Sequence, residues 1–399
     1  TLFWLVEILN SIIGQSSISL ISQSYGRKDD EGTAKAIEQT ITFKFLVAVI
    51  AAVLVALFLK PSLSLFSNDP NVITAALDYG YIRLFFLPMM FSSYSVNTAL
   101  RCIGDAKTPM YIMMLSSILN VLLDPLLMFD KFPGTAIPGF GMGVFGAAVA
   151  TIISQMVAFI LGFYIVFSGI EGVKPRLKGL FKLDWKIDKK LLTIGLPTGL
   201  ESFFRNLSGA VLLKFVAVYG TAAVAAVGVA GRLFGLAFMP LVGMNMGGSA
   251  MVGQNLGINN IERARKTAGT TAFISFSIMF FFVLIAFFAG EIVLGIFNKD
   301  PEIVKYGTEF LRYGSLGISI LAYGFGLSSV FGGSGYNLPF VISSITSRWF
   351  VQIPILFIMV HLLKASIIWV WLSYVFSDVT EALVMLIYYR KGKWEKKRA

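Results

Sequence analysis

Long apolar segments alternate with short polar connections along the entire chain. A helix that crosses a bilayer needs about 20 mostly apolar residues. The sequence contains several segments of this kind, so we expect an all-α polytopic membrane protein. The predicted helices cover residues 2–25, 39–60, 76–99, 109–130, 142–167, 190–219, 221–256, 267–290, 305–331, 339–363 and 366–389.

An internal repeat relates the two halves of the chain. With an offset of 231 residues, the segment 23–26 aligns with 254–257 and the segment 66–70 aligns with 297–301. The alignment needs no gap between these two segments, and it continues helix by helix in the same order. Such a parallel repeat predicts two similar lobes related by an axis along the membrane normal.

The repeat also predicts the limits of the lobes. The second half begins near Lys190, and its counterpart would lie about 40 residues before Thr1. We therefore expect a further helix upstream of this chain and twelve helices in the complete protein. The predicted parts are an N-terminal lobe at 1–167 with helices 2–6, a basic linker at 168–189, a C-terminal lobe at 190–390 with helices 7–12, and a basic tail at 391–399.

Composition and charge exclude several classes of protein. The chain is 56% hydrophobic and 14% charged, whereas a soluble domain has about 25% charged residues. Although the net charge is +11, most of the basic residues lie in short loops on one side of the predicted helices and in the tail. This placement indicates membrane topology rather than nucleic-acid binding, and it predicts that the linker and the C-terminus are cytoplasmic.

The sequence shows no motif of an enzyme. It has no Walker A loop, GxSxG elbow, HExxH pair or dinucleotide-binding fingerprint. One cysteine, Cys102, and one histidine, His361, exclude a disulfide framework and a multi-histidine metal site. We therefore expect no catalytic activity and no cofactor, and we expect an ion gradient to drive any work.

Asp124 is the first candidate for a functional residue inside a predicted helix. A carboxylate at the middle of a bilayer costs about 2.5–3.5 kcal/mol, so its presence indicates a function. Asn120 lies one turn earlier on the same face, and Pro125 cannot donate a backbone hydrogen bond to the Val121 carbonyl. These oxygen groups suit a monovalent cation, and the carboxylate can instead take a proton. The alternative is an Asn–Asp pair that only ties this helix to its neighbours.

The second candidate is Glu201, with Arg205 four residues later. The functional interpretation is a charge that attracts a cationic substrate. The alternative is an intrahelical ion pair that neutralises both side chains. In this part of the chain two single-residue deletions reduce the offset of the repeat to 229 residues, so Asp124 aligns with Ile353 and the ion site is expected in the first lobe alone.

Several segments together resemble the multidrug and toxic compound extrusion (MATE) transporters. The segments 99–109, 120–125 and 143–151 resemble the motifs of the family's first lobe, and 23–26, 195–197 and 390–394 also fit. The resemblance implies two six-helix lobes around a central cleft. It also implies antiport by alternating access, in which a sodium ion or a proton enters as a small organic, often cationic, compound leaves the cell.

The resemblance also implies the residues of the site. In the family, an Asn and an Asp on helix 5 and a Thr on helix 6 act with an Asp on helix 1. Asn120, Asp124 and Thr151 match the first three positions and would bind sodium or the proton, while helix 1 lies outside this chain. An acid that some members have in helix 10 is replaced here by Leu321, and another in helix 7 aligns with Arg205, so no second-lobe sodium site is expected.

Two functions remain open from the sequence. The first is a monomeric antiporter in the cytoplasmic membrane that exports small organic compounds, with Glu201 and Arg205 in the substrate cleft. The alternative is a flippase for a lipid-linked or polymeric substrate from the wider superfamily. A flippase for a pyrophosphate headgroup needs many cations on its helices, and the helices here carry few.

Overall fold

The computed structural model describes residues 2–64, 69–134 and 137–399, and nearly all of them are helical. Within these ranges there is no β-strand, only two isolated bridges in loops. The chain divides into two compact units, Thr1–Thr193 and Ile194–Ala399. All eleven segments predicted as membrane helices are helical over most of their length, so the predicted all-α class is confirmed.

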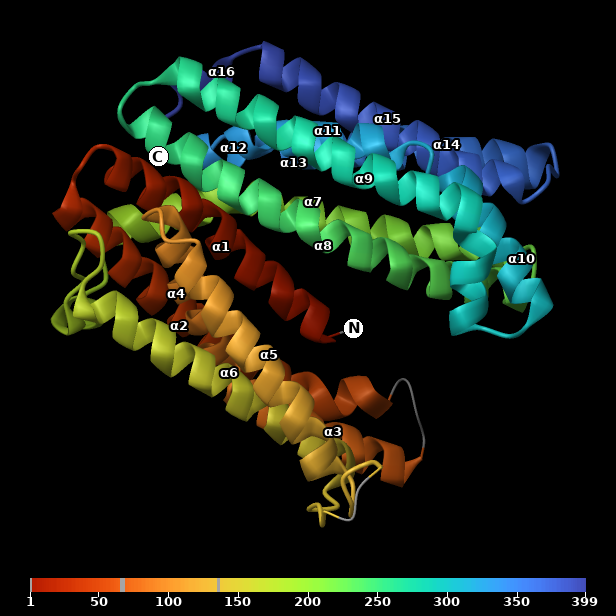
Figure 1. Cartoon of the computed structure of the whole chain (residues 1–399), viewed down its shortest axis with the longest axis horizontal. Helices are drawn as coiled ribbons and strands as arrows, with labels where there is room; N and C mark the ends of the chain where they lie inside the picture. Colours follow the sequence, from red (N-terminus) through yellow and green to blue (C-terminus); the bar gives the residue numbers. More distant parts are fainter. Residues whose placement is uncertain (1, 65–68, 135–136) are drawn as a thin grey trace. The chain divides into compact units, whose positions relative to one another are not determined.

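The described part of unit 1 contains the helices α1 to α6, the linker and the beginning of α7. In this unit α1 packs against α2 and α4, and α5 packs along α6 (Figure 1). Its elements are α1 (Leu2–Gly26), α2 (Asp30–Ser64), α3 (Pro70–Phe85), α4 (Leu87–Cys102), α5 (Lys107–Met128), α6 (Gly143–Ser168), the short 3₁₀ helix η1 (Leu177–Phe181) and the beginning of α7 (Trp185–Ala217).

Unit 2 contains the rest of α7 and the remaining helices. Here α8 packs against α9, and α11 packs between α9 and α15. The elements are α8 (Thr221–Gly257), α9 (Ile261–Phe297), α10 (Pro301–Glu309), η2 (Phe310–Gly314), α11 (Ile318–Leu327), α12 (Ser329–Ser334), α13 (Leu338–Ile345), η3 (Thr346–Gln352), α14 (Ile353–Leu356), η4 (Phe357–Leu362), α15 (Ile368–Arg390) and α16 (Lys393–Lys396), of which η2, η3 and η4 are π-helical.

Some predicted spans are broken in the structure. Among the described residues, seven helices are long and apolar enough to cross a membrane, and the segments 301–314 and 318–334, which meet at 51°, would form an eighth span. The predicted helix 76–99 is divided at Phe86 into α3 and α4, because Pro88 lies in the first turn of α4 and cannot continue the preceding hydrogen bonds.

The repeat is confirmed at the turns that join equivalent helices. Lys28, between α1 and α2, has φ 58°, and Asn259, between α8 and α9, has φ 56°. The side chain of Asp29 accepts from the Gly32 amide at 2.9 Å, just as Asn260 accepts from the Arg263 amide at 3.0 Å. Each pair of positions differs by the same offset of 231 residues, so the two halves use the same turn.

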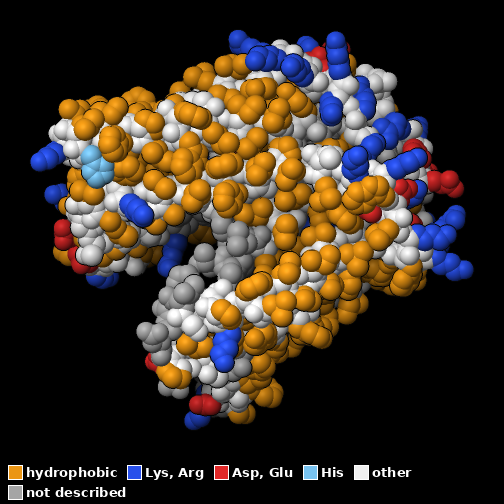
Figure 2. All heavy atoms as spheres, turned by 180° about the vertical axis from the view of Figure 1, so that it is seen from behind, with side chains coloured by type: hydrophobic (Ala, Val, Ile, Leu, Met, Phe, Trp, Pro, Cys, Tyr) orange, Lys and Arg blue, Asp and Glu red, His pale blue; other side chains and the backbone are white. Residues whose placement is uncertain are grey.

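The outer surface of the helices is apolar. Large hydrophobic side chains are exposed along α2, α5 and α9. On the face shown in Figure 2, hydrophobic side chains form broad areas, and most of the Lys and Arg side chains gather toward one edge. A soluble monomer rarely exposes large contiguous apolar areas. The surface is therefore suited to contact with the hydrocarbon chains of a lipid bilayer.

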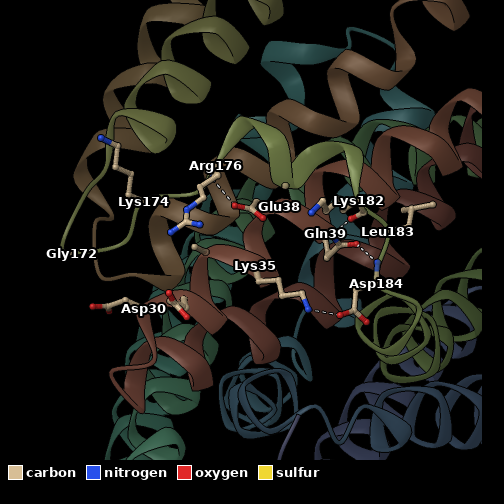
Figure 3. A pocket seen from close by; sticks show the side chains of 13 residues that line it. Asp30, Lys35, Glu38, Gln39, Gly172, Lys174, Arg176, Lys182, Leu183 and Asp184 are labelled. Carbon is tan, nitrogen blue, oxygen red and sulfur yellow. Dashed lines mark hydrogen bonds and ion pairs between the residues drawn. The ribbon is translucent and has the colours of Figure 1, made fainter.

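The linker is folded against the beginning of α2 (Figure 3). The Arg176 amide donates to Glu38 at 2.5 Å, and the Asp184 amide donates to the Gln39 side chain at 2.8 Å. The Asp184 carboxylate also forms an ion pair with Lys35 at 2.5 Å. A cavity of about 520 Å³ remains between the linker and α2. Because α7 starts directly after Asp184, these contacts hold the beginning of α7 close to α2.

Candidate ion-coupling site

Asn120 and Asp124 lie together on α5, which continues as one helix through Pro125. Both side chains are half-buried, and the Asn120 amide donates to the Asp124 carboxylate at 3.3 Å. Pro125 has no backbone N–H, so the Val121 carbonyl lacks its usual donor four residues later. The local sequence thus brings a carboxylate, an amide and a backbone carbonyl to one turn of helix.

The connection between α5 and α6 fixes the register of these two antiparallel helices. The Met142 amide donates to the Leu127 carbonyl at 2.9 Å. Further along, the Ser116 hydroxyl donates to the Ser154 carbonyl at 2.9 Å. Since an α-helix rises 1.5 Å per residue, Thr151 on α6 lies at about the level of Asn120 on α5.

Helical geometry also places Thr151 on the side of the α5–α6 pair that carries Asn120 and Asp124. Ser116 and Ser154 face each other across the pair, and successive residues of a helix are turned by 100°. Asn120 and Asp124 follow Ser116 by four and eight residues, and Thr151 precedes Ser154 by three. In antiparallel helices these offsets turn all three side chains toward the same groove. The Thr151 hydroxyl donates to the Ala147 carbonyl at 3.0 Å. Its oxygen lone pairs can therefore still accept or bind a cation.

The three side chains supply oxygen atoms of different charge. Asp124 provides the negative charge, and the Asn120 carbonyl oxygen and the Thr151 hydroxyl provide neutral dipoles. Hard cations prefer oxygen ligands of this kind. The same carboxylate can hold a proton in place of a cation, so the chemistry of the site allows either ion.

Glu201 and Arg205 belong to a charged network in unit 2. Arg205 forms an ion pair with Glu201 one turn earlier on α7, and a second ion pair with Glu381 of α15 at 2.6 Å. The Ser347 hydroxyl of η3 donates to the other Glu381 oxygen at 3.3 Å. The ion pair considered as the alternative for Glu201 is therefore present, and it connects three elements of unit 2.

Two further charged residues lie beside this network. Arg348 and Asp378 are close enough to influence each other electrostatically, and Asp378 is buried. Glu381 forms its ion pair with Arg205. Sequence reasoning missed the contact between α7 and α15, although two acids one turn apart in an apolar helix were a signal of it.

The comparison with known proteins decides the family. A family model described as MatE matches residues 1–126 and 197–358, which is most of the chain. The chain belongs to this family. The resemblance seen in the sequence motifs is confirmed, and as a MATE-family protein the chain is a multi-span membrane transporter.

Relatives of known description match nearly the full length of the chain. A Bacillus subtilis (strain 168) protein described as "Probable multidrug resistance protein YoeA" is 28% identical over 405 residues, covering 100% of this chain and 85% of its own length. The "Multidrug export protein MepA" of Staphylococcus aureus (strain MRSA252) is 26% identical over 384 residues, covering 96% of this chain and 82% of its own length.

Solved structures share the fold. A crystal structure of MATE in complex with MaD5 has a TM-score of 0.88 to this chain at 23% identity, and the match covers 98% of this chain and 85% of that one. This likeness confirms the predicted fold class, a polytopic helical protein of the MATE type.

Leu321 stands where some members of the MATE family have an acid in the second lobe, and the residues around it are apolar as well. Leu321 of α11 is buried in a cluster with Leu241 of α8 and Met279 of α9. An ion at this point would have no charged ligand from Leu321. The described arrangement therefore agrees with a coupling site in unit 1, which stays a prediction.

The linker holds two acidic groups near the beginning of α7 whose pKa values differ. The hydrogen bond from Lys35 lowers the pKa of Asp184. Burial, followed by the nearby charge of Asp184, raises the pKa of Asp188 to about 6. The Oδ1 atom of Asp188 is buried and makes no hydrogen bond within the described part of the chain.

Proposed function

We propose that this chain is a secondary active antiporter for small organic, often cationic, compounds. It exports them across the cytoplasmic membrane in exchange for sodium ions or protons, by alternating access. We propose further that it works as a monomer, with the linker 168–189 and the tail 391–399 in the cytoplasm. The descriptions of the relatives, which include multidrug resistance and multidrug export, support the substrate class.

The hydrogen-bonded pair of Asn120 and Asp124 is the observation that carries the proposal. Asp124 has no basic residue on its own helix apart from Lys107 at the far end. An ionised carboxylate in an apolar helix needs a counter-charge. A sodium ion or a proton would provide it, and Asn120 and Thr151 would help to bind a sodium ion.

Occupancy of Asp124 can then control the conformation. With the site empty, the charge is costly in any state that excludes water, and with the site filled this cost disappears. If two conformations differ in how well they bind the ion, the ion shifts the equilibrium between them. By linkage, the same difference changes the affinity for the exported compound.

The network around Arg205 suits a substrate role for Glu201. Arg205 is shared between two carboxylates, so Glu201 can leave it while the Glu381 ion pair remains. Glu201 is 16% exposed and Glu381 is 5% exposed, so Glu201 is the easier one to reach. We propose that an organic cation competes with Arg205 for Glu201.

Transport in proteoliposomes tests the antiport. The purified full chain is reconstituted without nucleotide, and export of a fluorescent organic cation is followed under an imposed sodium gradient or an imposed proton gradient. We expect export under at least one of the two gradients. Export that requires ATP and ignores both gradients would contradict the proposal.

A further inference from the structure

Lys44 of α2 is completely buried inside unit 1, with 0% of its surface exposed. Its ammonium nitrogen lies 4.2 Å from the ring centroid of Tyr94 and 5.9 Å from that of Phe91, both on α4. On the α1 side, a Cβ added to Gly14 would lie 3.4 Å from the nitrogen. The side chain thus ends in a small cage formed by α1 and α4.

The ammonium nitrogen of Lys44 is buried without a hydrogen-bond partner among the residues that the structure describes. An ammonium group has three N–H donors, and removing it from water costs several kcal/mol unless they are satisfied. The attraction to a desolvated aromatic face returns only about 2 kcal/mol. The geometry therefore favours the neutral amine in this conformation.

The charged groups that face Lys44 come from both neighbouring helices. Glu7 of α1 attracts an ammonium at this position, and Arg101 of α4 repels it. Glu7 is itself exposed and accepts a hydrogen bond from Asn10 at 3.1 Å, so it is not a direct partner of Lys44.

The other elements that contact α2 do so away from Lys44. The contacts between the linker and α2 begin at Lys35 and end at Thr42, whose hydroxyl donates to the Leu180 carbonyl at 2.9 Å. Helix α3 approaches near the far end of α2, where Leu59 lies 2.8 Å from a Cβ added to Gly80. The described contacts of the amine are thus those of the cage between α1 and α4.

We propose that Lys44 is a proton-binding site of unit 1, separate from Asp124 and without a proton in the conformation described. When α1 and α4 move apart from α2 and water enters, the amine lone pair takes a proton from a hydronium ion, which becomes neutral water, and the amine becomes an ammonium. Before the cage closes again, the ammonium returns this proton to a departing water molecule, which carries it away as hydronium. The role of Lys44 in transport rests on the proposed antiport. In that role Lys44 exchanges one proton in each transport cycle, in addition to the ion at Asp124.

The protonation state can be measured without any transport. The full chain is labelled with ¹⁵N-lysine, and the side-chain nitrogen signals are recorded at pH 7 in lipid nanodiscs. We expect one signal at the position of a neutral amine, lost in Lys44→Met and kept in the control Lys35→Met, whose target is 53% exposed and ion-paired to Asp184. Only ammonium signals in the wild type, or an amine signal that survives in Lys44→Met, would overturn the proposal.

Two substitutions then test the role in transport. Arginine stays charged, so Lys44→Arg cannot release the proton and should lower export by about tenfold or more. Lys44→Met removes a buried polar group, so it should fold, and it should release fewer protons per exported molecule than the wild type. Wild-type export by Lys44→Arg, or an unchanged proton count in Lys44→Met, would contradict the role in transport.

The two levels of the proposal fail in different ways. If the wild type ignores both ion gradients, the proposed antiport is wrong, whereas the nitrogen signals still decide whether Lys44 is a neutral amine. If the wild type exports its substrate and Lys44→Arg behaves like it, only the assignment of Lys44 is wrong.

Discussion

The ion pairs of Arg205 make a quantitative prediction for the stability of unit 2. In Arg205→Met, the carboxylates of Glu201 and Glu381 lose their shared cation. Removing one partner of a buried ion pair costs about 3–5 kcal/mol, because the other charge stays buried and unpaired. Arg205 is 36% exposed, so water screens part of this effect, and we expect a loss of about 2–3 kcal/mol.

The matched substitution at Glu201 should cost much less. Glu201→Gln leaves the ion pair between Arg205 and Glu381 in place, so the loss should be about 1 kcal/mol or less. The double variant with Arg205→Met and Glu381→Gln should be more stable than Arg205→Met alone, because the buried unpaired carboxylate is gone. Unfolding of the purified protein in mixed micelles, followed by tryptophan fluorescence at constant pH, gives these differences. Equal losses for Arg205→Met and Glu201→Gln, or additive losses in the double variant, would refute the network.

Three further predictions concern the two proposed sites and the linker. Glu201→Gln should change which organic cations are exported and their apparent affinity, while sodium or proton binding to the purified protein stays at the wild-type level. Asn120→Ala should weaken ion binding about tenfold without abolishing it, because Asp124 keeps its charge while one ligand is lost; unchanged ion affinity in a binding titration would show that the amide is not a ligand. Folding raises the pKa of Asp188 from its ordinary value of 3.8 to about 6. The folded protein therefore holds this proton more tightly than the unfolded chain, and it loses stability as the pH rises from about 4 to above 6. Asp188→Asn should therefore raise stability at pH 7.5 by up to about 3 kcal/mol and leave it unchanged at pH 4, and a parallel loss at both pH values would contradict this.

The helices and the repeat could be predicted because both depend on local sequence. A run of apolar residues about as long as the bilayer is thick predicts a membrane helix without any knowledge of its neighbours. The repeat also preserved the turns, where Lys28 and Asn259 adopt the same backbone conformation. The pairing of Asn120 with Asp124 was predictable as well, since four residues make one helical turn.

Contacts between distant parts of the chain could not be predicted in this way. Two acids one turn apart in α15 were a signal that a basic partner lies nearby, but nothing local in the sequence indicates that this partner is Arg205 of α7. The cage around Lys44 was also missed, because α1 and α4 form it only when they pack against α2. The folded linker was not expected either, although Glu38 and Gln39 both bind its backbone.

Ion-driven export by Asp124→Asn is the most direct test of the coupling site. The substitution removes the charge and keeps the shape, so the variant should insert normally and bind its organic substrate. In liposomes, export under a sodium gradient and under a proton gradient is compared with that of the wild type, with Asp130→Asn, an exposed acid just beyond α5, as the control. We expect Asp124→Asn to lose ion-driven export and Asp130→Asn to keep it. Wild-type rates for Asp124→Asn under both gradients would contradict the account, since Asp124 would then only tie α5 in place.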